Sequence, residues 1–187
     1  MGGCRGAKEL FNSFALVSYF SGPLLKFLDG LRCELVHECE GNAHLTVLPP
    51  RPLVCSPDEA WKELKSRLSE FQPFRVELAD VEVFPTTQVI YLGLKSGNAE
   101  LARLHQTLNA GRCQFQEPFP FHPHVTLARD LPDDKVPAAA ELATRRWREF
   151  KQPRDFMIDQ LVFVKNTYNN CWMDVADYGL DHSKIAI

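Results

Sequence analysis

The sequence lacks a strong charge of either sign. Its 187 residues include 21 Lys and Arg against 24 Asp and Glu, which gives a formal net charge of -3 and a pI of about 6.1. Proteins that bind long nucleic acids usually carry a basic field that displaces counterions from the phosphates. The charge balance therefore disfavours a nucleic-acid duplex as the ligand. A short or single-phosphate ligand in a local basic cleft stays compatible with it.

The chain also lacks the cysteine spacing of zinc sites and disulfide scaffolds. No C-x-x-C occurs, and no cysteine stands with a histidine at zinc-finger spacing. We expect these cysteines to be reduced, small buried hydrophobes. They are Cys4, Cys33, Cys39, Cys55, Cys113 and Cys171. The sequence therefore predicts neither a structural metal site nor a cofactor.

No continuous apolar run is long enough for a membrane span or a signal peptide. Gly6 stands where an N-myristoylation motif requires Ser or Thr. Hydrophobic residues make up 45% and charged residues 24%, which is ordinary for a globular protein. We expect a soluble, cytoplasmic monomer with no membrane partner.

One pattern of strands and helices occurs twice along the chain. The first half predicts a strand at 14–20, a helix at 23–36, a strand at 43–48, a helix at 57–71 and a strand at 74–84. The second half predicts a strand at 88–95, a helix at 98–108, a strand at 124–129, a helix at 134–150 and a strand at 156–165, followed by a last strand at 171–175. Ser56 and Glu59 form the sequence pattern of a capping box at the start of the second helix.

Each half thus has the order β-α-β-α-β, and a repeat found early changes the expected architecture. We predict an α+β fold in one bilobal domain, with repeats at about 13–85 and 87–178. Two antiparallel sheets would line a central cleft with the helices outside. A single doubly wound parallel sheet is the competing interpretation. Against it, no glycine-rich phosphate loop follows either early strand.

The middle strand of each half carries the motif H-x-T. Side chains two positions apart on a strand point to the same face. His44 therefore projects with Thr46, and His124 projects with Thr126. A single H-x-T is more often an ordinary strand position, but two copies at the same point of a repeat favour function. If the halves pack as a pseudo-symmetric pair, two imidazoles and two hydroxyls meet in one pocket.

This combination suits cleavage of a phosphodiester. Imidazole titrates near neutral pH, so one histidine can act as a base while the other, protonated, acts as an acid. Threonine hydroxyls can hold the non-bridging oxygens where charge accumulates. No metal ion is required. The sequence leaves open which histidine is the acid, and which of the two ester oxygens departs.

The two motifs, HLT at 44–46 and HVT at 124–126, resemble the signature of the 2H phosphoesterases. The text PFPFHPHVTLARD is similar to the bacterial 2′-5′ RNA ligase-like branch, and the resemblance spans nearly the whole chain. It implies a bilobal fold and action on 2′,3′-cyclic phosphates or 2′-5′ linkages of nucleotides or RNA ends. It also implies catalysis by His44 and His124 and phosphate binding by Thr46 and Thr126. Where many members have glycine after the first motif, this chain has Pro49-Pro50, which leaves the substrate open.

Several further residues are weaker candidates for substrate contacts. Arg129 lies just past the second motif, Arg51 follows the prolines of the first, and His122 shares a strand face with His124. Lys165 resembles a residue at the cleft rim of the family. Tyr168 and Trp172 could stack on a base, although packing is the commoner role of such aromatics. The basic cluster Arg145, Arg146, Arg148, Lys151 and Arg154 fits a solvated helix face better than an RNA footprint. His37, His105 and His182 show no partner pattern, and we expect them at the surface.

Three other functions stay open at this point. The fold could bind RNA or nucleotides without turnover, although both motifs are intact. It could cleave a cyclic phosphate that is not a nucleotide. It could use His122 and His124 as zinc ligands, but no cluster of Asp, Glu or Cys accompanies them.

Overall fold

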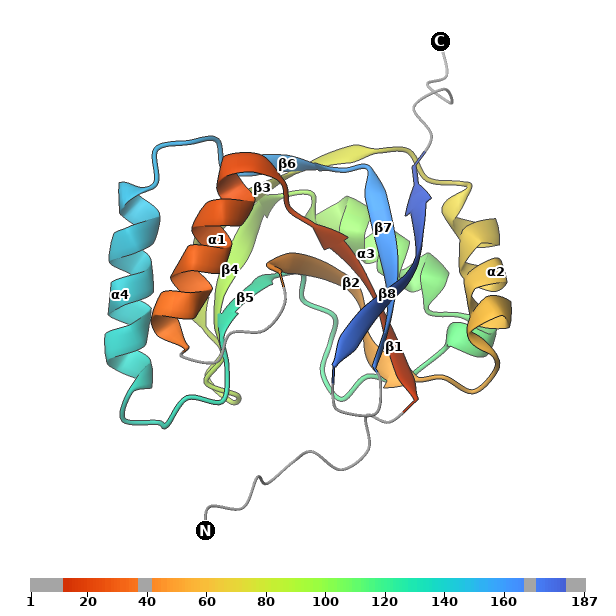
Figure 1. Ribbon diagram of the computed structural model, residues 1–187, viewed down its shortest axis with the longest axis horizontal. Coiled ribbons are helices and arrows are strands. Elements are labelled where there is room, and N and C mark those ends of the chain that lie inside the picture. Colours follow the sequence, from red (N-terminus) through yellow and green to blue (C-terminus); the bar gives the residue numbers. More distant parts are fainter. Residues whose placement is uncertain (1–11, 37–41, 167–170, 181–187) are drawn as a thin grey trace.

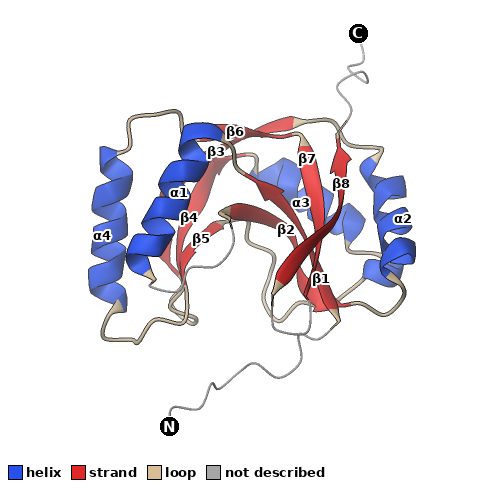
Figure 2. Ribbon diagram, in the orientation of Figure 1, coloured by secondary structure: helices blue, strands red, loops and turns tan. Residues whose placement is uncertain are grey.

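The structure is a computed structural model that describes residues 12–36, 42–166 and 171–180. It contains two four-stranded sheets with the strand orders β2-β1-β7-β8 and β5-β4-β3-β6. Figure 1 shows α1 and α4 beside the second sheet and α2 and α3 beside the first, and Figure 2 shows the sheets between these helix pairs. The predicted α+β class with two antiparallel sheets is confirmed, because every strand pair is antiparallel. The competing doubly wound parallel sheet is wrong.

The strands and helices follow the predicted order. The strands are β1 (Ser13–Tyr19), β2 (His44–Pro52), β3 (Phe74–Val83), β4 (Ile90–Ser96), β5 (Val125–Ala128), β6 (Asp155–Ile158), β7 (Gln160–Asn166) and β8 (Trp172–Gly179). The helices are α1 (Gly22–Leu35), α2 (Pro57–Leu68), α3 (Asn98–Leu108) and α4 (Val136–Glu149), with a short 3-10 helix at Gly111–Cys113. The capping box of α2 is present, since the Glu59 N–H donates to Ser56 Oγ and the Ser56 N–H donates to the Glu59 carboxylate.

Each sheet contains strands from both halves of the chain: β3 of the first half lies in the second sheet, and β7 and β8 of the second half lie in the first sheet. β3, which ends the first predicted repeat, lies between β4 and β6, and β7, from the second repeat, lies between β1 and β8. The helices cross over in the same way, because α1 contacts β5 and α3 contacts β2. The division at about residue 86 remains an interpretation of the sequence. The two halves are interlocked rather than placed side by side.

Two predicted strand boundaries were wrong for physical reasons. β2 runs on through Pro49, Pro50 and Pro52 instead of ending at 48. This is possible because β2 is an edge strand that pairs only with β1, so missing N–H groups can face away from the ladder. The expected strand 156–165 is two strands in different sheets, separated at Asp159, where the chain passes from one sheet to the other.

One apolar core joins both sheets and all four helices. Its largest buried members include Phe14, Phe163, Leu28 and Trp147. At Gly97, which has φ +90°, a Cβ would lie 2.7 Å from a Val76 methyl group, so the turn from β4 into α3 requires glycine. The core fixes the two sheets on each other and leaves the edge strands β2 and β5 in contact.

Candidate active site

The two H-x-T motifs meet because both lie at sheet edges. β2 is the outer strand of one sheet and β5 the outer strand of the other, and these two edges contact each other. In Figure 1, β2 and β5 approach each other in the middle of the molecule. His44 begins β2 and His124 directly precedes β5, so the two histidines lie on strand edges that contact each other. The structure thus brings the two predicted histidines together.

On β2, His44 and Thr46 share a face, as the strand period requires. His44 pairs with Tyr19 and Thr46 pairs with Val17 in the register of β1 and β2. The alternate residues, among them Leu45, are fully buried in the core on the other side. Burial of the alternate side chains fixes which face the motif presents.

The second motif repeats this arrangement at the start of β5. His124 lies directly before the strand, and Thr126 pairs with Tyr91 of β4. Val125 and Leu127 point into the core. The motif therefore presents the same pair of groups from the facing sheet edge.

Each catalytic candidate ring is held through Nδ1 by a backbone carbonyl two residues earlier. His44 Nδ1 lies 2.8 Å from the Asn42 oxygen, and His124 Nδ1 lies 2.6 Å from the His122 oxygen. A carbonyl oxygen only accepts hydrogen bonds, so Nδ1 carries the hydrogen in both rings. Nε2 of each ring has no hydrogen-bond partner among the described residues. Nε2 is therefore the ring nitrogen that could accept a further proton in both cases.

The surroundings keep His44 closer to its neutral form. Burial lowers the pKa of His44 below its ordinary value of 6.5, and the hydrogen bond to Asn42 opposes this shift. The positive charges of Arg32, Arg129 and His124 lower the pKa further. Nearby cations disfavour the imidazolium, so this ring tends toward the state that accepts a proton.

The pKa of His124 is lowered as well, chiefly by burial. The hydrogen bond to the His122 carbonyl opposes the shift, and the charge of the His122 ring adds to it. Both rings therefore titrate below their ordinary value of 6.5, so the neutral form of each free ring predominates at neutral pH.

The two threonines are available to a ligand. Both side chains are half-buried, and neither the Thr46 nor the Thr126 hydroxyl has a partner in the parts of the chain that the structure describes. The two hydroxyls can donate hydrogen bonds to a phosphoryl group, and each Nε2 accepts a proton when its ring is neutral and donates when it is protonated.

Aromatic rings border His124, and no local sequence pattern predicts these contacts. Phe84 stacks on Tyr91 with ring centroids 3.9 Å apart, and both meet His124 edge to face at 5.0 and 5.3 Å. His122 stands against the same pair, 5.3 Å from Phe84 and 6.2 Å from His124. The Tyr91 hydroxyl donates to Glu82. These contacts fix the orientation of the His124 ring.

On the other side, Tyr19 stands edge-on to His44 at 6.2 Å. Its hydroxyl donates to Asp174 on β8 at 2.7 Å, and burial together with this carboxylate raises the pKa of Tyr19. Tyr19 stays a neutral hydrogen-bond donor at physiological pH. The position of Tyr19 beside His44 follows from the register of β1 with β2, which the sequence alone does not show.

Two of the weaker candidates for substrate contacts, Arg129 and Lys165, lie in different surroundings. Arg129 is exposed, and its Nε lies 3.7 Å from Asp130 Oδ2. Its positive charge is one of those that lower the pKa of His44. Lys165 pairs with Phe14 on the face of β7 that carries Phe163, which is the helix-covered face. Thr46 lies on the opposite face of its sheet, and the rim position of Lys165 stays a prediction.

Two further predictions were wrong because the structure buries the side chains. Arg51 does not reach a ligand from a loop: it lies within β2, is 1% exposed, and its guanidinium binds protein groups. His105 is not at the surface: it is buried and its Nδ1 donates to the Val47 oxygen.

The remaining candidates add little to the site. Tyr168, His37 and His182 lie outside the described residues. Trp172, at the start of β8, is half-buried against the small cluster of Ala15, Val17, Val162 and Val164. In the basic cluster, Arg146 pairs with Glu34 at 2.6 Å and Arg154 lies over Trp147, so these two have structural partners.

No group of three or more His, Cys, Asp or Glu that could hold a metal ion occurs among the described residues. None of the helices in the described part of the chain is both long and apolar enough to cross a membrane.

Comparison with known proteins places this geometry in a family. The sequence model of the 2'-5' RNA ligase superfamily matches residues 37–170, which include both motifs. The chain belongs to this superfamily. A relative from Geobacillus kaustophilus, named as a phosphoesterase, is 33% identical over 100 residues, covering 49% of this chain and 57% of its own. One from Oceanobacillus iheyensis, with the same kind of name, is 33% identical over 115 residues, covering 61% and 65%. The chain thus spans less than two thirds of these relatives.

Solved structures confirm the fold. E. coli LigT complexed with 3'-AMP superposes with a TM-score of 0.62 at 18% identity, covering 90% of this chain and 98% of that one. Usb1 of Kluyveromyces marxianus with uridine monophosphate gives a TM-score of 0.52 at 12% identity, covering 88% and 99%. The two-sheet architecture is therefore shared with these proteins.

Proposed function

We propose that the chain is a phosphodiesterase that uses His44 and His124 as its acid and base and needs no metal ion. Its substrates would be 2′,3′-cyclic phosphates or 2′-5′ linkages of nucleotides or short RNA ends. The observation that carries the proposal is the convergence of two H-x-T pairs whose Nδ1 atoms are anchored and whose Nε2 atoms have no partner among the described residues. The family and its phosphoesterase-named members support the reaction class, and the nucleotides in the titles of the similar structures suggest the substrate class.

The reaction needs one neutral and one protonated imidazole. The neutral Nε2 removes a proton from water as the water oxygen bonds to phosphorus. The bond from phosphorus to the 2′ or 3′ oxygen breaks in line, and the protonated Nε2 of the other ring gives its proton to that oxygen. Charge builds on the non-bridging oxygens, where Thr46 and Thr126 can donate hydrogen bonds. After the reaction the rings have exchanged protonation states.

The decisive test is a screen of 2′,3′-cyclic nucleotides and 2′-5′ linked dinucleotides, with products identified by phosphorus NMR. We expect hydrolysis to a monoester, at a rate unchanged after exhaustive chelation. A protein that binds these compounds without turnover would be a nucleotide-binding module instead. Turnover restricted to cyclic sugar phosphates without a base would replace the nucleotide substrate, and loss of activity on chelation would contradict metal independence.

The pH dependence follows from the lowered pKa of both histidines. In the free enzyme kcat/KM peaks between the two pKa values, so we expect its maximum below pH 6.5. Above it the acid loses its proton, and below it the base gains one. A bound anionic phosphate favours imidazolium and raises both pKa values, so kcat should peak at a higher pH than kcat/KM. Initial rates between pH 4.5 and 8.5, about two units on either side of the ordinary histidine value, test this. A kcat/KM maximum above pH 7 would contradict it.

Replacing Thr46 or Thr126 by valine removes a hydroxyl and keeps the β-branched shape. We expect kcat to fall about 10- to 100-fold in each variant. Removing one positioned donor to the developing charge can lower kcat by about 100-fold or more. The matched control is Thr144→Val on α4, whose hydroxyl donates to the Ala140 carbonyl within its own helix. Equal rates in all three variants would remove the threonines from the proposed mechanism.

A further inference from the structure

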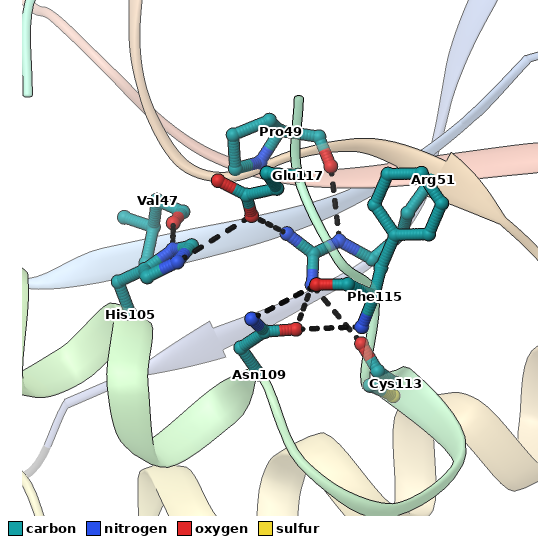
Figure 3. Close-up of polar contacts among 8 residues, drawn as sticks. All are labelled: Val47, Pro49, Arg51, His105, Asn109, Cys113, Phe115 and Glu117. Atoms are coloured by element: carbon teal, nitrogen blue, oxygen red, sulfur yellow. Dashed lines mark hydrogen bonds and ion pairs between the residues drawn. The ribbon is translucent and has the colours of Figure 1, made fainter. Parts of the chain in front are cut away.

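A buried polar cluster lies next to the two motifs, and the proposed reaction does not use it. It consists of Arg51, His105, Asn109 and Glu117 (Figure 3). The side chains of Arg51 and Glu117 are 1% and 10% exposed. The cluster joins β2, α3 and the segment 114–124, which ends in His124.

Arg51 ties the strand of one motif to the segment that leads to the other. Its Nη2 donates to Glu117 Oε1 at 2.6 Å, and its Nη1 donates to Asn109 Oδ1 at 2.8 Å and to the Cys113 oxygen at 3.0 Å. Its Nε donates to the Pro49 oxygen. The guanidinium therefore holds β2 against the beginning of segment 114–124.

His105 touches both motifs' immediate neighbours. Its Nδ1 donates at 2.9 Å to the oxygen of Val47, which directly follows Thr46. Its Nε2 lies 3.4 Å from Glu117 Oε1. Its ring stacks on Phe121, just before the second motif, with centroids 3.9 Å apart and planes at 4°. One imidazole thus spans the chain beside Thr46 and the chain leading to His124.

Asn109 closes the same segment at its start. Its Oδ1 accepts from the Phe115 N–H at 2.8 Å, and its Nδ2 donates to the Phe115 oxygen at 3.1 Å. Segment 114–124 is therefore fixed at Phe115, Glu117 and Phe121 before it delivers His124.

A buried ion pair is seldom the most stable filling of its space, because well-packed apolar side chains often do as well or better. A satisfied polar network does, however, favour one geometry over others. Acid–base catalysis depends on such geometry, since a misplacement of about 1 Å can cost about 100-fold in rate.

We propose that Arg51, His105 and Glu117 are positioning residues that set the two H-x-T motifs in register with each other without touching the substrate. The inference rests on the proposed function for its catalytic consequence. Its structural part, the mutual placement of His44 and His124, can be measured without turnover.

The test is His105→Phe, which keeps a flat ring against Phe121 and removes the bond to Val47 and the contact with Glu117. We expect kcat to fall about 10- to 100-fold with little change in KM. NMR titration should show that the pKa values of His44 and His124 lie closer to 6.5 than in the wild type. The reason is that burial at the contacting strand edges lowers both pKa values. His105→Asn, whose amide can donate to the Val47 oxygen, should recover part of the rate.

The control for lost stability is Trp147→Phe, which removes a buried bond from the Trp147 indole to the Ala79 oxygen, away from both motifs. All variants are compared at a temperature where unfolding curves show them folded. Wild-type kcat and wild-type histidine titrations in His105→Phe would overturn the proposal. If the wild type itself cleaves no phosphodiester, the proposed function fails, while the titrations still decide whether the cluster positions the motifs.

Discussion

Replacing either His44 or His124 by alanine is expected to lower kcat by about 10²–10⁴-fold, the usual contribution of a general acid or base. KM should change much less, because each Nε2 acts mainly on proton transfer in the transition state and not on substrate binding. The kcat of the double variant should be only a little lower than that of the less active single variant, because the effects of residues that act as a unit are not additive. Rates on the best substrate of the screen, with product analysis, measure this.

Lys62→Ala, on the exposed side of α2, serves as the control for handling and folding. Circular dichroism and the unfolding midpoint should match the wild type in every histidine variant whose rate is interpreted. Wild-type kcat in either single variant would remove that histidine from the mechanism. It would leave the family assignment and the fold untouched.

The largest expected loss of stability follows from Trp147→Ala. Trp147 is 1% exposed, donates from Nε1 to the Ala79 oxygen at 2.8 Å, and carries the Arg154 guanidinium at 4.3 Å. Truncating a buried tryptophan leaves a cavity and typically costs about 3–5 kcal/mol. We expect that loss in the free energy of unfolding from urea titration.

The matched control is Val54→Ala, because Val54 is 74% exposed. It should change the free energy of unfolding by no more than about 0.5 kcal/mol. A loss below about 1.5 kcal/mol for Trp147→Ala would mean that α4 repacks on the sheet and that the tryptophan is not a main support of this part of the core.

The alternation of side chains on a strand made part of the site predictable. It placed His44 with Thr46 and His124 with Thr126, and the register of β2 and β5 with their neighbours agrees. The convergence of the two pairs followed from the repeat. What each residue does in a reaction stays a prediction that the variants above test.

Other features depend on contacts between distant parts of the chain and left no local pattern. A charged residue after prolines is typical of a loop, so the sequence predicts that Arg51 is exposed. In the structure Arg51 is buried and binds Glu117 and Asn109, which lie far from it in the sequence. His105 looked unpartnered because its partners, Val47 and Phe121, lie far from it in the sequence. Strand pairing is likewise non-local, so the placement of β3 and β7 in opposite sheets could not be read from periodicity.

The exchanged central strands have a consequence for how this architecture could have arisen. A chain cut between β3 and β4 would yield a first piece that carries β3 of the second sheet and a second piece that carries β7 and β8 of the first sheet. Neither piece could close its own ladder, and each would expose an unpaired edge prone to association. A lone β-α-β-α-β unit could satisfy its backbone by trading that strand with an identical copy, as in domain-swapped dimers. In the present chain two such units would be joined end to end, with His44 in one half and His124 in the other, and with β8 as an additional strand on the first sheet.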